Sequence, residues 1–107
     1  MTDVREVKAH RAVRECLRRY LEFEEVCKQE GSYEVECAGL RINFSDLKGV
    51  LKDLPVRQKD ALFYAVICDY KHGDVAVRMG ITRTSVGQYV GQATREIARK
   101  LCSDWEQ

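Results

Sequence analysis

Apolar residues between positions 54 and 101 recur every three or four residues, which is the spacing of amphipathic helices. The pattern predicts a helix from about Val56 to Tyr70, a second from Asp74 to Met79, and a third that begins at Thr82 or Arg83. The short link between the last two helices is typical of a helix-turn-helix. The expected core positions are Ala61, Leu62, Ala65, Val66 and Cys68 in the first helix, Val75, Ala76 and Met79 in the second, and Val86, Val90, Ala93, Ile97 and Leu101 in the third.

The residues of the link fit a tight turn between two packed helices. Gly80 follows the second helix, where glycine adopts a left-handed backbone without a steric penalty. Ile81 is expected to fill the gap between the helices, and Thr82 can cap the third helix. Ala76 is small where the two helices must cross closely.

If Val86 and Val90 face inward, the opposite face of the third helix is polar. A helix-turn-helix presents such a face to the DNA major groove, where Gln pairs with adenine, Arg with guanine, and Ser or Thr with either. The alternative is a helical hairpin whose polar face meets only water. The DNA hypothesis assigns base reading to Arg83, Thr84, Ser85, Gln88 and Gln92, and phosphate contacts to Arg78, Arg95, Arg99 and Lys100.

The N-terminal third predicts one long helix from Asp3 to Glu30, capped by Thr2 or Asp3 and ended by Gly31. A second face of this helix is basic. Its expected buried stripe comprises Val13, Cys16, Leu17, Tyr20, Phe23 and Cys27.

Residues 33–44 change to a period of two, with Ala38-Gly39 between the two alternating runs. This pattern indicates a short β-hairpin, although Ala-Gly is a poorer turn than Asn-Gly. An irregular loop is the competing interpretation. Ser45 is then expected to cap a short helix from Asp46 to Asp53.

These elements predict a mainly α domain with a C-terminal helix-turn-helix and a short β-hairpin. The 107 residues suffice for a single domain, 1–107, divided into an N-terminal helix (1–30), a hairpin or loop (31–45) and a helix-turn-helix part (46–107). No apolar run approaches the ~18 residues of a membrane span, and the start lacks the apolar core of an export signal. We therefore expect a cytoplasmic protein without a membrane contact, in which the five cysteines are reduced and mostly buried.

The net charge of +1 conceals three charged zones. Residues 5–19 carry six cations against two anions, and residues 78–102 carry five cations against one anion. Residues 22–36, between them, carry six anions against one cation. Because DNA phosphate attracts basic surface and repels acidic surface, only part of the molecule suits DNA. The acidic zone faces either water or another protein.

Other chemistry is poorly supported by the residue pattern. Cys68 and His72 are four residues apart near a helix end and could place two metal ligands side by side, with Cys37 as a third, but no fourth ligand follows from spacing. The favoured interpretation is a core Cys68 and a surface His72, and we expect neither a metal nor a cofactor. No catalytic motif is present, and the prediction is a non-enzyme. Trp105 is expected to pack on the core.

The C-terminal half resembles region 4 of bacterial RNA polymerase sigma factors. The family opens with Leu-Pro and a basic-polar pair, as in residues 54–58 (LPVRQ), and continues with an IA..LGIS core, matched by residues 75–82 (VAVRMGIT). Its recognition helix begins like residues 83–86 (RTSV). By position, the resemblance places the five proposed base-reading residues on the DNA face and Arg57 at a phosphate contact. The helix-turn-helix of LuxR-type regulators is the nearest alternative.

The resemblance also implies a contact with the β-flap of RNA polymerase. The chain departs from the family at Lys71, where a Ser or Thr cap is usual, and at Gly87 and Gly91, where longer residues are usual. Nothing resembles the sigma region that melts the promoter, and the length is expected to be too short for a complete sigma factor. The resemblance therefore implies a stand-alone sigma-like regulator, of the type that phages and mobile elements use.

The sequence leads to two functional hypotheses. The first is a sequence-specific transcriptional regulator that binds double-stranded DNA. The second is an adaptor that binds RNA polymerase or a sigma factor with little or no DNA binding, for which the acidic zone and the two glycines of the third helix are the best support. The target sequence, the sign of regulation and the oligomeric state do not follow from the sequence.

Overall fold

The computed structural model describes residues 4–31 and 33–101, with side chains from residue 7 onward, and is mainly helical. The expected cap at Thr2 or Asp3 and the expected packing of Trp105 lie outside the described residues. The predicted fold class, mainly α with a helix-turn-helix and a short hairpin, is confirmed. The elements are α1 (Val4–Arg18), α2 (Tyr20–Glu30), β1 (Glu34–Cys37), β2 (Leu40–Asn43), α3 (Phe44–Asp53), α4 (Val56–Leu62), the π-helical turn η1 (Phe63–Ile67), α5 (His72–Met79) and α6 (Arg83–Leu101).

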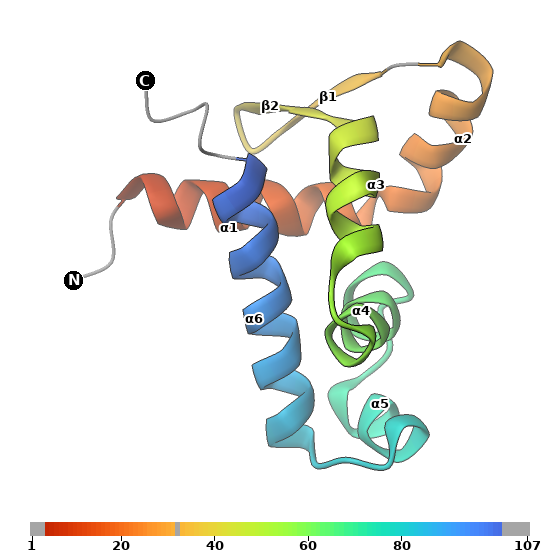
Figure 1. Cartoon of the computed structure of the whole chain (residues 1–107), viewed down its shortest axis with the longest axis vertical. Coiled ribbons are helices and arrows are strands. Elements are labelled where there is room, and N and C mark those ends of the chain that lie inside the picture. The colour runs from red at the N-terminus through yellow and green to blue at the C-terminus, as the bar shows by residue number, and fades with distance from the viewer. Residues whose placement is uncertain (1–3, 32, 102–107) are drawn as a thin grey trace.

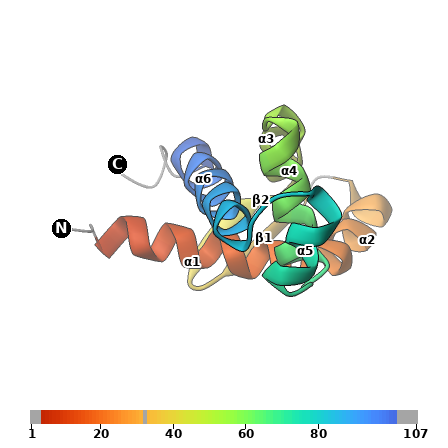
Figure 2. The same cartoon turned by 90° about the horizontal axis from the view of Figure 1, so that it is seen from below.

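Helix α6 is the central helix of the molecule. It packs against α1, α3, α4 and α5, and its buried side chains join one continuous apolar cluster. Figure 1 shows α5 beside the N-terminal end of α6 and α1 crossing its C-terminal half. Figure 2, seen from below, places α5 and the turn at the near end. The predicted core positions Val86, Val90, Ala93 and Ile97 are all buried, and Leu101 is half-buried.

The prediction of one helix from Asp3 to Glu30 is wrong, because the chain bends at Arg19. The backbone there has φ −101° and ψ 16°, outside the helical region, yet the Arg19 carbonyl still accepts a hydrogen bond from the Phe23 N–H (3.0 Å). The bend turns α2 toward α3, so that the Tyr20 and Phe23 rings lie 5.0 and 6.1 Å from the Phe44 ring. The predicted end at Gly31 (φ 79°) is confirmed.

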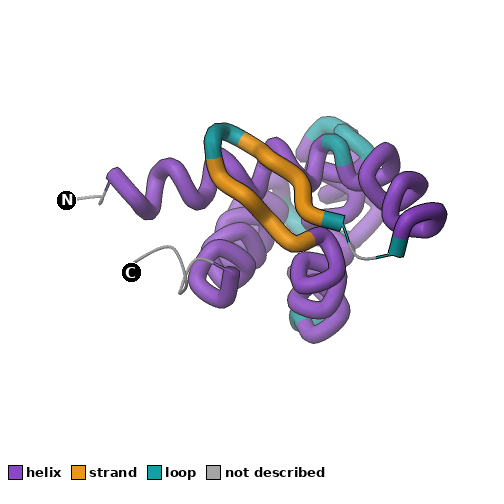
Figure 3. Tube along the Cα trace, turned by 90° about the horizontal axis from the view of Figure 1, so that it is seen from above, coloured by secondary structure: helices purple, strands orange, loops and turns teal. Residues whose placement is uncertain are grey.

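The predicted β-hairpin is confirmed, and its register pairs Val35 with Ile42 and Cys37 with Leu40. Ala38 (φ 49°) and Gly39 (φ 80°) form the two-residue loop. Positive φ at both positions is what the twist of a two-residue hairpin loop demands. Figure 3 shows the hairpin lying over the helices, at the end of the molecule away from α5.

Three further helix boundaries differ from the prediction, one of which is the start of α5 at His72 rather than Asp74. Helix α3 begins at Phe44, which is fully buried, and its cap is Asn43, whose Oδ1 accepts from the Asp46 N–H (3.1 Å); the expected cap at Ser45 is wrong. The helix expected to reach Tyr70 ends at Ile67 after the wider π turn. Asp69 (φ 58°) then reverses the chain. Within residues 4–31 and 33–101, no helix combines the length and apolarity needed to cross a membrane.

Candidate nucleic-acid interface

The turn between α5 and α6 is fixed by backbone hydrogen bonds at the end of α5. Gly80 is left-handed (φ 67°, ψ 36°), and its N–H donates to the Val77 carbonyl (3.3 Å). The Ile81 N–H donates to the Ala76 carbonyl (3.0 Å), which completes the paired bonds of a Schellman motif. The predicted left-handed glycine is therefore confirmed, and it sets the direction in which the chain leaves α5.

Thr82 fixes the start of α6. Its Oγ1 accepts from the Ser85 N–H (3.1 Å) and its hydroxyl donates to the Ser85 Oγ (2.9 Å). This confirms the predicted cap, and it gives Ser85 a structural partner within the first turn. Ser85 is half-buried, so its base-reading role, which remains a prediction, competes with the cap.

The polar face of α6 is exposed as predicted from the inward valines. Arg83, Thr84, Gln88 and Gln92 are all exposed, whereas Val86 and Val90 on the other side are buried. Gly87 is also exposed and lies among them. The structure thus brings these four predicted side chains onto one continuous surface at the turn end of α6.

Two of these side chains contact neighbouring helices. The Gln92 Oε1 accepts from the Gln58 Nε2 of α4 (3.3 Å), a partner that the sequence did not indicate. The Arg83 side chain lies over Gly73 of α5, where an added Cβ would be 3.7 Å from the Arg83 Nε. These contacts bound the polar face on its α4 and α5 sides, and they leave Thr84 and Gln88 between the two.

Arg78, a predicted phosphate contact, is exposed on α5 and is held by two aromatic rings. Its guanidinium carbon lies 5.0 Å from the Tyr70 ring centre and 5.7 Å from that of Tyr64, and the two rings are stacked 6.2 Å apart. Tyr64 and Tyr70 are six residues apart and would lie on different faces of one helix. The chain reversal after η1 brings them together, so this cation–π group could not be predicted from helical spacing.

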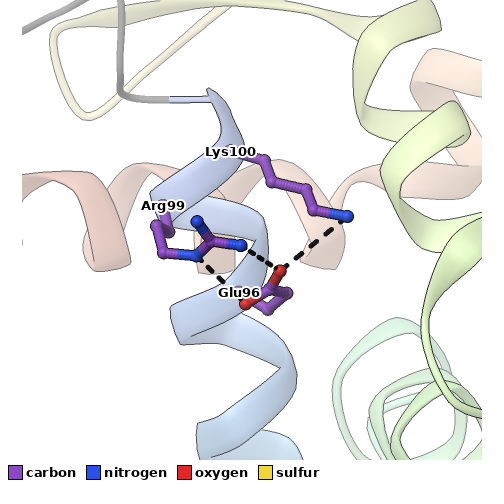
Figure 4. Close-up of polar contacts among 3 residues, drawn as sticks. All are labelled: Glu96, Arg99 and Lys100. Atoms are coloured by element: carbon purple, nitrogen blue, oxygen red, sulfur yellow. Dashed lines mark hydrogen bonds and ion pairs between the residues drawn. The ribbon is translucent and has the colours of Figure 1, made fainter.

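Arg99 and Lys100 lie away from the turn. The Arg99 guanidinium bonds both oxygens of Glu96 (2.7 and 3.2 Å), and the Lys100 Nζ lies 3.8 Å from the same carboxylate (Figure 4). The hydrogen bonds from Arg99 lower the pKa of the Glu96 carboxyl. At a rise of 1.5 Å per residue, Arg99 is about 24 Å along α6 from Arg83. Two further phosphate contacts were predicted, and both are exposed. Arg95 lies on α6 between Arg83 and Arg99, and Arg57 lies in the first turn of α4.

Acidic residues are concentrated at the end of the molecule opposite the turn. Their side chains on α2 and β1 are exposed, as at Glu25, Glu30 and Glu36. Figure 1 shows α2 and the hairpin at the top and α5 at the bottom. Since repulsion between these carboxylates and phosphate falls off with distance, the acidic zone leaves the turn end of α6 suited to DNA.

The suggested metal ligands do not lie on one helix. Cys68 follows η1 and is half-buried rather than core, and His72 begins α5 and is exposed. Cys37 is in β1. Among the residues that the structure describes, no three His, Cys, Asp or Glu side chains gather in a way that could hold a metal ion.

Comparison with known protein families matches the family model "Sigma-70, region 4" to residues 45–97. The matched segment is just under half of the chain; it begins in α3, includes the whole turn, and ends in α6 before Arg99. It leaves out α1, α2 and the hairpin. The searches of curated proteins and of solved structures return no match. The predicted resemblance is confirmed: this segment is a sigma region 4-like helix-turn-helix.

Proposed function

We propose that this chain, whose residues 45–97 form a sigma-70 region 4-like helix-turn-helix, is a stand-alone transcriptional regulator that binds double-stranded DNA sequence-specifically. One observation carries the proposal: an exposed polar face at the start of α6, held by the Gly80 turn and the Thr82 cap, inside the segment that matches the family. Sigma region 4 modules bind DNA and RNA polymerase and are not enzymes. The proposed site of action is the cytoplasm, where bacterial DNA lies.

In this proposal the turn end of α6 enters the major groove. Gln88 pairs with adenine through its amide, Arg83 pairs with guanine, and Thr84 adapts to either. Arg57 and Arg78 bind phosphates on either side, because each is exposed on a helix that packs against α6. Arg95 is exposed further along α6 itself and binds a phosphate there. Of the three side chains, that of Arg78 is the most preorganised for phosphate binding, because the rings of Tyr64 and Tyr70 restrict its conformation.

Arg99 and Lys100 take a smaller part in this mechanism than the sequence suggested. Both already contact Glu96, and Arg99 is about 24 Å from Arg83, twice the ~12 Å width of the major groove. We assign Gln92 and Ser85 to the border of the reading surface, because each has a partner within the protein.

The second candidate is the adaptor, which binds RNA polymerase or a sigma factor with little or no DNA binding. The acidic surface of α2 and β1 favours it, because these elements lie outside the matched segment and face away from the turn. Contact with RNA polymerase is compatible with both candidates. Sequence-specific DNA binding separates them.

The test is selection of bound duplexes from a randomised DNA pool by the full chain at low and at physiological salt. We expect an enriched motif whose affinity falls as salt rises, because phosphate binding releases counterions. Binding without enrichment would contradict base reading. Absence of binding at low salt would contradict the regulator and favour the adaptor, which is then tested by capture of purified RNA polymerase subunits.

A further inference from the structure

A basic face of helix α1 has no role in the proposed contacts of α6 with DNA. Residues 5–19 carry six cations against two anions, and α1 lies outside the segment that matches the sigma family. Four of these cations are exposed on α1 and form what we call the basic stripe: Lys8, Arg11, Arg14 and Arg18. The helix-turn-helix by itself gives no reason for this charged surface.

The basic stripe lies opposite the buried face of α1. Successive residues of an α-helix are about 100° apart, so the four side chains of the stripe fall within about 120° of the helix circumference. The opposite direction belongs to the buried positions of α1, which are Ala9, Ala12, Val13, Cys16 and Leu17. That face joins the apolar core, where α1 packs against α6, β1 and η1. Because the core holds α1 by one face, the stripe is held toward solvent.

The charges of the basic stripe are not neutralised by the described part of the chain. None of the four side chains forms a hydrogen bond or an ion pair with a described residue. By contrast, the guanidinium of the neighbouring Arg19 lies 2.9 Å from the Glu22 carboxylate. Glu15 is the one carboxylate among residues 7–18, and it is half-buried. Like charges three or four residues apart on a helix repel one another, and a bound anion removes this repulsion.

The residue types of the basic stripe fit a phosphate backbone. Arg and Lys bind phosphate oxygens through charge-assisted hydrogen bonds, and such contacts carry no sequence information. From Lys8 to Arg18 the helix rises about 15 Å, which equals the rise of about four base pairs of duplex. A membrane surface fits less well, because a helix that lies in a membrane inserts its apolar face, and the apolar face of α1 is buried in the core.

The position of α1 beside α6 brings the basic stripe near the DNA that α6 is proposed to read. Figures 1 and 2 both show α1 crossing α6 and extending past it, on the side away from α3 and α4. The molecule measures 40 × 38 × 21 Å. The stripe is therefore little more than one helical turn of DNA, about 34 Å, from the polar face of α6. A duplex that continues past the reading site by one turn is long enough to reach α1.

We propose that the basic stripe binds phosphates of the DNA that flanks the base pairs read by α6. This inference rests on the proposed function, because α6 must hold the duplex for α1 to reach it. The stripe adds affinity without adding sequence preference, since its side chains contact only the backbone. Helix α1 thereby extends the DNA-binding surface beyond the segment that matches the sigma family.

The experiment compares two duplexes that contain the motif selected by the full chain. The short duplex ends at the motif, and the extended duplex adds about ten base pairs, one helical turn, on each side. Fluorescence anisotropy measures the affinity for each duplex at several salt concentrations. We expect the full chain to bind the extended duplex more tightly and with a steeper dependence on salt, because additional phosphate contacts release additional counterions.

Variants of the basic stripe separate its contribution from the general effect of duplex length. Arg11→Gln combined with Arg14→Gln removes two charges at exposed positions. On the extended duplex we expect at least about tenfold weaker binding at about 0.1 M salt, and a slope of log affinity against log salt that is smaller by about two. On the short duplex the same double variant is expected to bind as the unaltered chain does.

Lys28→Gln combined with Arg41→Gln is the matched control, because it also removes two exposed charges, one on α2 and one on β2. It is expected to leave the affinity for both duplexes unchanged. Thermal unfolding verifies the fold of each variant. If the first double variant unfolds, Lys8→Gln combined with Arg18→Gln tests the basic stripe in its place, with the same expected loss.

The outcomes distinguish this proposal from the proposed function. If the Arg11 and Arg14 variant binds the extended duplex as tightly as the unaltered chain does, the proposal is overturned while the proposed function stands. The variant is also expected to enrich the unaltered motif from the randomised pool. A changed motif would assign the stripe to base reading and would contradict phosphate contact. If the unaltered chain binds no duplex at all, both proposals fail.

Discussion

Thr82 and Gln88 have different roles at the start of α6, because the Thr82 side chain is hydrogen-bonded within the protein and the Gln88 side chain is exposed. The Thr82 hydroxyl is used within the protein, where it caps the helix and bonds Ser85. Gln88 is exposed two turns further along, on the same side as Thr84. A residue that caps a helix determines where the helix begins, whereas an exposed amide on the helix face is available to a base.

Replacement of Gln88 by Ala is expected to cost about 1–3 kcal/mol of binding free energy on the preferred DNA site and to relax the sequence preference at one base pair. The reason is loss of a bidentate contact to a base. Titration of the selected duplex and of duplexes altered at single positions measures both effects.

Gln29→Ala is the matched control, because Gln29 is exposed on α2 at the opposite end of the molecule. It is expected to leave DNA affinity unchanged. An equal loss on all duplexes for Gln88→Ala would assign Gln88 to the backbone rather than to a base.

Cys16 of α1 and Cys37 of β1 are buried thiols on two elements that pack against each other. Burial raises the pKa of both thiols above the ordinary value of 9.0, and it is the largest influence on each. Because a thiolate is the reactive form, these two cysteines are protected in the folded chain.

Two results are expected from these thiols. At about pH 8, iodoacetamide modifies half-buried Cys27 and Cys68 before Cys16 and Cys37 in the folded chain. The free energy of unfolding is also expected to fall as the pH rises above 9.0, because the unfolded state then releases protons that the folded thiols retain. Peptide mass spectrometry and urea unfolding at about pH 8 and about pH 10 measure the two effects. Early modification of Cys16, or stability that does not fall between these pH values, would contradict the assignment.

Helix α6 contains Gly87 and Gly91 within its first three turns, where glycine weakens a helix. An added Cβ at either position would meet nothing within 4 Å. Packing inside the protein therefore gives no reason for a glycine. Close approach of the α6 backbone to DNA is a reason that is consistent with the proposed function.

Gly87→Ala and Gly91→Ala are each expected to raise the free energy of unfolding by about 0.5–1 kcal/mol, since alanine costs less backbone entropy in a helix. If the backbone lies close to DNA, the same changes lower DNA affinity. Urea unfolding and titration of the selected duplex measure the two quantities on the same samples.

Gly49→Ala is the control within another helix. An added Cβ at Gly49 of α3 also meets nothing within 4 Å, so a similar gain in stability is expected. DNA affinity is expected to stay unchanged, because the proposed DNA contacts lie on α1, α4, α5 and α6 and none lies on α3. Unchanged DNA affinity in Gly87→Ala and Gly91→Ala would show that neither position approaches DNA.

At the scale of the whole molecule, α1 supports the helix-turn-helix although it lies outside the matched segment. It packs against α6 and η1, and Leu17 on α1 is fully buried in the shared core. The N-terminal part and the helix-turn-helix are therefore expected to unfold together.

Leu17→Ala is expected to lower the free energy of unfolding by about 2–5 kcal/mol, because it leaves a cavity in this core. Hydrogen exchange of the Val13 and Val90 amides should accelerate together. Leu21→Ala is the matched control, since Leu21 is 60% exposed, and a change within about 0.5 kcal/mol is expected. Faster exchange at Val13 with unchanged protection at Val90 would mean that the two parts unfold separately.

Local patterns determined the helix-turn-helix and the hairpin. Val75, Gly80, Thr82 and Val86 lie within a dozen residues, and their roles depend on helix periodicity, a left-handed glycine and a cap, all of which are local. The hairpin follows likewise from a period of two around Ala38–Gly39. These features were predictable because neighbours along the chain supply the constraints.

The tertiary structure decided the features that depend on residues distant in the sequence. The bend at Arg19 exists because Tyr20 and Phe23 pack on Phe44, and the aromatic support of Arg78 exists because the chain reverses after η1. The bend likewise places Leu21 of α2 beside residues of α3 and η1, around a groove of about 530 Å³. The periodicity of a sequence predicts which face of a helix is apolar. It does not predict the element against which that face packs, because the hydrophobic effect is non-directional and the closest packing can involve any part of the chain.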